Sequence, residues 1–211
     1  MKLRFLHEHG AGVSFLHSFS DTGARFEWAL TNVEPEPQRV RSVALVFAVD
    51  DIEGPLRMFR HGYQSWSWSD VATFGVDVDP STLADNEFFQ AGHHADQRTV
   101  TERDELRSEW FTVLADDGAE RIRVGFGGSG DHDGTLRLRH AADGSGVELW
   151  AEAFLGDAEL APRESRPLHP VITKSGTDEL ELLDSWADRV GASANARTGA
   201  PFQVGWCSWY H

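Results

Sequence analysis

Apolar and polar residues alternate in short runs along most of the chain, as is typical of β-strands. Segments rich in Gly, Asp and Pro separate these runs. The sequences Asp116-Asp117-Gly118 and Asp143-Gly144-Ser145-Gly146 have the composition of hairpin turns, and we also interpret the glycine-rich segment 125–130 as a hairpin connection. The predicted strands are residues 4–9, 13–19, 25–32, 40–49, 109–114, 121–127, 135–139 and 147–154. This spacing predicts an all-β fold, a large antiparallel sandwich, for residues 1–175.

One segment within this region has no clean period. Residues 69–101 carry Gly, Asp, Pro and aromatic residues, which suggests a long excursion over one edge of the sandwich. Long loops inside compact domains often have functional roles.

The pattern changes near residue 176, where helical spacing begins. Leu180, Leu183, Ala187 and Val190 form one stripe, which Leu182 and Trp186 broaden. The spacing predicts a helix over residues 178–190, begun by Thr177 or Ser175 and ended by Gly191. Residues 176–200 are therefore expected to be a linker helix and a linker, since residues 192–201 are small, polar and helix-breaking.

The last residues, 201–211, end in an apolar, aromatic run that is typical of a buried strand. Such a strand would leave unpaired backbone groups and exposed aromatic rings at the end of a domain. We therefore expect the chain to be the amino-terminal fragment of a longer protein, and residues 201–211 to begin another domain.

Composition narrows the classes of partner. The chain has 34 acidic and 19 basic residues, and its net charge of −15 would repel nucleic acid and anionic membranes. Cys207 is the only cysteine, so an internal disulfide is excluded, and no long apolar stretch follows Met1. We expect a cytoplasmic protein that binds neither nucleic acid nor membranes.

Two segments combine aromatic rings with hydroxyl and amide groups, a mixture that suits a sugar. The first, residues 57–69, includes Tyr63, Gln64 and Trp66, and the second, residues 206–211, includes Trp209 and Tyr210. A pyranose packs its apolar face on an aromatic ring and bonds its hydroxyls to fixed polar groups. By residue type alone, core packing is the simpler interpretation of these tryptophans.

The two segments together resemble the α-galactosidases of glycoside hydrolase family 36. The similarity is specific at the segments His61-Gly62-Tyr63-Gln64-Ser65-Trp66-Ser67 and Val204-Gly205-Trp206-Cys207-Ser208-Trp209-Tyr210-His211. It implies an amino-terminal β-supersandwich packed on a (β/α)8 barrel, with residues 201–211 beginning the first barrel strand. Trp66 would then pack against a terminal galactose, and Trp209 and Tyr210 would line the same subsite. Trp68 has no such role in the family, and we expect it to pack in the protein.

The resemblance implies retaining hydrolysis of terminal α-D-galactosides such as melibiose and raffinose. One carboxylate attacks the anomeric carbon while a second, roughly 5 Å away, protonates the departing oxygen. In the family both are Asp residues on later barrel strands, so the catalytic pair is expected beyond His211, in a barrel domain that the fragment lacks and would need as its partner. The fragment alone is expected to be inactive. Alternatives are a galactosyl transferase, an α-N-acetylgalactosaminidase, or a non-catalytic carbohydrate-binding sandwich.

The histidines indicate neither a cofactor nor a metal site. His7 and His9 lie on one face of a predicted strand, but no third ligand is evident. His93 and His94 are adjacent, and neighbours on an extended chain face opposite ways, so a shared metal is not expected.

Overall fold

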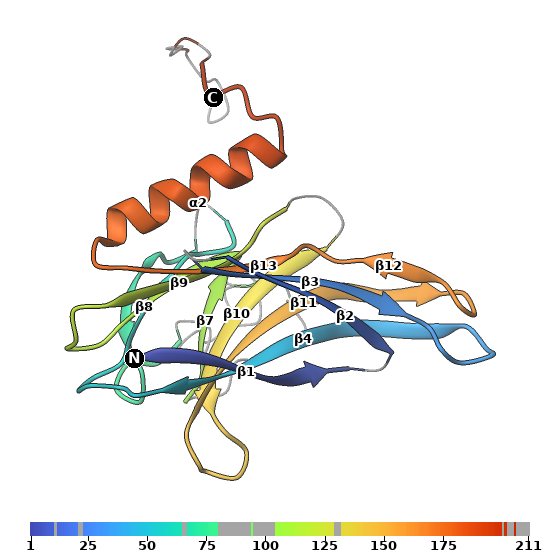
Figure 1. Cartoon of the computed structure of the whole chain (residues 1–211), viewed down its shortest axis with the longest axis horizontal. Coiled ribbons are helices and arrows are strands. Elements are labelled where there is room, and N and C mark those ends of the chain that lie inside the picture. Colours follow the sequence, from blue (N-terminus) through green and yellow to red (C-terminus); the bar gives the residue numbers. More distant parts are fainter. Residues whose placement is uncertain are drawn as a thin grey trace, which may run out of the picture.

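The computed structural model describes residues 1–10, 12–20, 23–64, 67–79, 94, 104–128, 132–199, 201 and 205. Within these residues the chain is an all-β sandwich of two antiparallel sheets followed by a helix (Figure 1). The predicted fold class is confirmed for the sandwich and the helix. The expected barrel strand, residues 201–211, lies almost wholly outside the described residues.

The first sheet has five strands in the order β1-β4-β11-β10-β7. Its middle strands are long, and β4 is buried on both faces over most of its length, which explains its continuous apolar sequence. The strands are β1 (Lys2–His9), β4 (Gln38–Asp50), β7 (Leu106–Glu109), β10 (Asp133–His140) and β11 (Val147–Leu160).

The second sheet follows the order β12-β3-β13-β9-β8-β5-β6, and β2 pairs with β3. The hairpins β8–β9 and β10–β11 have the predicted turns between them, and β2 and β3 also pair as antiparallel neighbours. The strands of this sheet are β2 (Val13–Ser20), β3 (Gly23–Thr31), β5 (Arg57–Arg60), β6 (Asp70–Thr73), β8 (Phe111–Ala115), β9 (Arg121–Phe126), β12 (Ser165–Pro167) and β13 (Val171–Gly176).

Apolar side chains of both sheets fill the space between them. Phe47 of β4 and Phe26 of β3 meet edge to face with their ring centroids 5.1 Å apart, and Phe5 of β1 lies within 5.9 Å of both rings. These rings belong to one buried cluster that draws on most strands of the sandwich. Two predicted features of the chain's path are wrong.

The first error concerns residues 109–114, which were expected to form one strand. The chain instead turns at Trp110, whose φ of 68° is left-handed, so that β7 lies in one sheet and β8 in the other. A bulky residue adopts this conformation only under strain. Neighbouring backbone supports it, because Trp110 N–H donates to the Gly134 carbonyl and Phe126 N–H donates to the Trp110 carbonyl.

The second error concerns the glycine-rich segment 125–130, interpreted as a hairpin connection. Residues 125 and 126 belong to β9, and the next strand, β10, belongs to the other sheet, so the connection between them is not a hairpin. Glycine content alone does not separate these two kinds of connection.

Helix α2 (Glu179–Ser193) lies on the outer face of the second sheet, over β9 and β13 (Figure 1). Its N-cap is Asp178, whose carboxylate accepts from the amides of Leu180 and Glu181; the predicted caps, Thr177 and Ser175, are wrong. The helix also continues past Gly191. Leu182 is buried against the sheet, whereas Leu180, placed in the predicted stripe, is 72% exposed.

Candidate functional site

The loop between β5 and β6 carries most of the first segment that combines aromatic rings with hydroxyl and amide groups. It begins at His61, directly after β5, and reaches β6 at Asp70. Gly62 N–H donates to Ser69 Oγ at 3.0 Å, and Gln64 N–H donates to Ser67 Oγ at 3.1 Å. Ser67 N–H returns a bond to the Gln64 carbonyl. The two residues that flank positions 65 and 66 are therefore joined to each other.

Gly62 is required by a close approach within this loop. A Cβ atom at this position would lie 2.5 Å from the Ser67 Cβ and 2.9 Å from the Trp68 carbonyl oxygen. At these distances the added Cβ atom would overlap with its neighbours. The backbone at Trp68 could not move away without moving the rest of the loop. Any larger residue would therefore open the loop.

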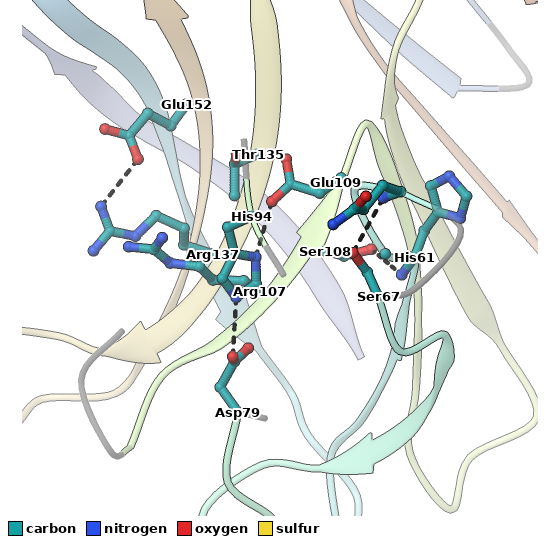
Figure 2. Close-up of polar contacts among 12 residues, drawn as sticks. His61, Ser67, Asp79, His94, Arg107, Ser108, Glu109, Thr135, Arg137 and Glu152 are labelled. Carbon is teal, nitrogen blue, oxygen red and sulfur yellow. Dashed lines mark hydrogen bonds and ion pairs between the residues drawn. The ribbon is translucent and has the colours of Figure 1, made fainter. Parts of the chain in front are cut away.

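The base of the loop is hydrogen-bonded to β7, close to the point where the chain passes from β7 to β8. Ser108 Oγ accepts from His61 N–H at 2.8 Å (Figure 2). Ser108 Oγ also donates to the Phe111 carbonyl, and Glu109 N–H donates to the His61 carbonyl at 2.9 Å. Because Ser108 is fully buried, these bonds are shielded from water. The loop therefore starts from a rigid position.

Aromatic contacts connect the loop base to helix α2. The rings of His61 and Phe111 lie 4.8 Å apart, and those of Phe111 and Trp186 lie 4.2 Å apart. Trp186 Nε1 donates to the Phe126 carbonyl at 3.2 Å. Burial lowers the pKa of His61, and nearby Glu109 opposes this shift only in part. His61 is thus a neutral side chain at physiological pH.

Next to the loop base, a buried histidine bridges two carboxylates. His94 Nδ1 lies 2.9 Å from Glu109 Oε1, and His94 Nε2 lies 2.9 Å from Asp79 Oδ1 (Figure 2). Thr135 Oγ1 donates to the other Glu109 oxygen at 3.0 Å. With a carboxylate oxygen at each ring nitrogen, the arrangement suits an imidazolium that donates twice. Burial opposes that charge, but the bonds to Asp79 and Glu109 raise the pKa of His94 above its ordinary value.

The same outer face of the first sheet carries a chain of ion pairs. Glu105 accepts from Arg107 Nε at 2.9 Å and from Arg137 Nη2 at 2.8 Å. Arg137 Nη1 donates to Glu152 at 2.9 Å (Figure 2). Burial disfavours the carboxylate, but Arg137 and Arg107 hold the pKa of Glu105 below its usual range. Ion pairs, in place of apolar contacts, therefore cover this part of the outer face of β7, β10 and β11.

The structure describes none of the three predicted sugar-binding residues. Trp66, Trp209 and Tyr210 lie outside the described residues, so their predicted roles stay predictions. On the same loop, Tyr63 is 41% exposed and Trp68 is 61% exposed. The expectation that Trp68 packs inside the protein is therefore wrong.

His7 and His9, considered above as possible metal ligands, have different surroundings. His9 lies beside Trp150, with ring centroids 4.8 Å apart, while His7 is exposed. Among the described residues, no group of three or more His, Cys, Asp or Glu side chains is arranged to hold a metal ion. Nor, within the same residues, is any helix both long and apolar enough to cross a membrane.

The sequence does not indicate the bridge formed by His94. Its local pattern is two adjacent histidines, whereas each carboxylate partner is 15 residues away in the sequence. No local pattern joins positions so far apart.

Comparisons with protein-family models and with curated proteins found no match. Among solved structures, the chain is similar to an α-galactosidase from Thermus thermophilus in complex with p-nitrophenyl α-D-galactopyranoside: 13% identity, TM-score 0.40, covering 84% of this chain and 31% of that one. It is also similar to a GH36 α-galactosidase from Geobacillus stearothermophilus in complex with raffinose: 11% identity, TM-score 0.48, covering 82% and 23%.

A third similar structure is an α-galactosidase from Lactobacillus brevis, with 9% identity and a TM-score of 0.42, covering 89% of this chain and 29% of that one. The chain therefore spans less than a third of the length of each of these three proteins. At such low identity, the likeness concerns the fold alone: an all-β sandwich followed by a helix.

Proposed function

We propose that this chain is the amino-terminal part of a retaining α-galactosidase that hydrolyses terminal α-D-galactosides of oligosaccharides such as melibiose and raffinose. One observation carries the proposal: the sequence pairs a Gln64-Ser65-Trp66 segment with the terminal run Gly205 to His211. The combination resembles the two sugar-subsite segments of glycoside hydrolase family 36.

The surroundings of the first segment support this proposal. The loop follows β5, is bonded at its base through Ser108 and His61, and is closed on itself by Gln64 and Ser67. A sugar subsite needs such a fixed support, because a displaced aromatic platform loses both packing and hydrogen-bond geometry. Trp66 would supply the platform, and Trp209 and Tyr210 would line the same subsite.

The chemistry would come from a barrel domain that follows this sandwich. An aspartate there would attack the anomeric carbon, and a second would protonate the leaving oxygen and then activate water. No carboxylate of residues 1–211 is assigned either role. In this proposal the sandwich binds and orients the non-reducing galactose while the barrel reacts with it.

The experiment compares two tryptophans of one loop in the full-length protein. Trp66→Ala should lower kcat/KM for p-nitrophenyl α-galactoside at least tenfold, since lost aromatic packing of about 1.4 kcal/mol or more corresponds to that factor. Trp68→Ala, two residues along, is the matched control and should leave the kinetics nearly unchanged. Equal kinetics in the Trp66 variant and the wild type would remove the proposed subsite. Hydrolysis by the 211-residue chain alone would contradict catalytic aspartates beyond His211.

A second candidate function is a non-catalytic carbohydrate-binding module. The exposure of Tyr63 and Trp68 on the same loop favours it, because aromatic platforms alone suffice to bind sugars. Calorimetric titration of the 211-residue chain with galactose separates the two functions. Binding by the chain alone favours the module, whereas the hydrolase proposal expects a complete subsite only when the barrel is present.

A further inference from the structure

Beneath helix α2 lies a buried arginine for which the described residues provide no counter-ion. Arg123 of β9 is 2% exposed, yet in the part of the chain that the structure describes neither its Nε nor its Nη1 has a hydrogen-bond partner. A guanidinium stays charged in proteins, and a buried charge left unpaired is strongly destabilising. The site is therefore incomplete as it stands.

The position of Arg123 follows from the register of β9. Ile122, Val124 and Phe126 point into the sandwich core, so Arg123 points to the opposite face, which α2 covers. The residue directly across from it on β13 is Lys174, and the one across on β8 is Val113. Arg123 thus has a second cation on one side and an apolar neighbour on the other.

A third cation belongs to the helix that covers this face. Arg189 of α2 is exposed, and α2 packs against β9; burial and, to a lesser degree, the charge of Arg189 lower the pKa of Arg123 to about 10. Among the described residues no carboxylate pairs with Arg123, although α2 carries Glu181, Asp184 and Asp188. Glu179 pairs with Arg121 at 2.6 Å, and Asp117 pairs with Arg57 at 3.1 Å.

We propose that Arg123 and Arg189 form a binding site for a small oxyanion, a carboxylate or phosphate group, between β9 and helix α2. The planar guanidinium presents paired donors that match two oxygens of such a group. The anion is small because the protein's own atoms already cover Arg123, which leaves no surface for a second polypeptide. Exposed Arg189 marks the side from which the anion enters. The site is separate from the proposed sugar function and does not depend on it.

Thermal denaturation of the chain in inorganic phosphate tests the site, with sodium chloride holding the ionic strength constant. Phosphate should raise the Tm of the wild type saturably, by roughly 5–10 °C at a hundredfold excess over Kd. Arg123→Met should show no phosphate effect, and without phosphate its Tm should exceed that of the wild type by at least about 2 °C, since a buried unpaired charge is removed. The matched control is Arg39→Met, which removes an exposed charge on the other sheet and should respond like the wild type.

Calorimetric titration gives a second measurement that does not rely on replacing a buried residue. The wild type should bind one phosphate, and Arg189→Met should raise the Kd about tenfold through loss of one charge-assisted interaction. An unshifted wild-type Tm, an equal phosphate shift in Arg123→Met, or unchanged affinity in Arg189→Met would each overturn the proposal.

Discussion

Replacing His94 by leucine tests the bridge between Asp79 and Glu109. The variant removes two bonds of 2.9 Å and leaves two buried carboxylates without their shared cation. Both partners are at most 8% exposed at the side chain, so solvent screens little of the interaction. Removing one partner from a buried ion pair costs about 3–5 kcal/mol, and we expect a loss of that size in the free energy of unfolding.

The pH dependence of the wild type follows from the same contacts. The folded-state pKa of His94 is raised above its ordinary value of 6.5. Its contribution to stability is therefore complete below about pH 6.5 and is lost as the pH rises through the folded-state pKa. His94→Leu has no imidazolium to lose, so this alkaline decline should be absent from the variant.

Urea denaturation followed by tryptophan fluorescence, repeated from about pH 6 to pH 9, measures both effects. His7→Leu is the matched control: His7 is exposed, and its loss should change the free energy of unfolding by no more than about 0.5 kcal/mol. A His94 variant that stays within about 1 kcal/mol of the wild type and keeps its pH profile would refute the doubly bonded imidazolium.

Two further substitutions probe the outer faces of the two sheets. Gly125→Ala would place a Cβ atom 2.6 Å from Trp186 Nε1 and 2.9 Å from Phe111 Cβ. This overlap should lower the free energy of unfolding, measured by thermal denaturation, by about 1–3 kcal/mol. Gly146→Ala, whose Cβ atom meets nothing within 4 Å, is the control and should not lower it. Glu105→Gln should destabilise by about 3–5 kcal/mol near pH 7, because it leaves Arg107 and Arg137 without their shared carboxylate. The pKa of Glu105 is lowered in the fold, so the stability that its carboxylate contributes is present above about pH 4.5 and is lost on acidification. The free energies of unfolding of wild type and variant should therefore converge as the pH falls. A constant difference between them at all pH values would contradict this.

Local patterns predicted the sandwich well where turn chemistry and strand alternation agreed. The hairpins β8–β9 and β10–β11 follow from Asp-Gly and Gly-Ser-Gly turns between alternating runs. Helix α2 followed from its spacing, although its cap shifted to Asp178, whose carboxylate reaches two amides of the first turn.

The remaining features depend on contacts that no short pattern encodes. Trp110 turns the chain between sheets without a glycine to mark the place. The alternation in β9 predicts that Arg121 and Arg123 share the outer face, but only the packing of α2 makes Arg123 buried and Arg121 paired. In the candidate site, the sequence indicated the segment of residues 57–69, while its support at Ser108 required the tertiary structure.

The pairing of β4 with β11, and of β3 with β12 and β13, has a consequence for synthesis on the ribosome. At 5–20 residues per second, the interval between Asp50 and Val147 takes on the order of 5–20 s, during which β4 lacks one neighbour and the inner faces of β1, β3 and β4 have no complete core. A nascent chain in that interval exposes a long apolar strand edge to other chains. Chaperone binding to the emerging polypeptide should therefore peak before β11 appears and fall once β13 has been made.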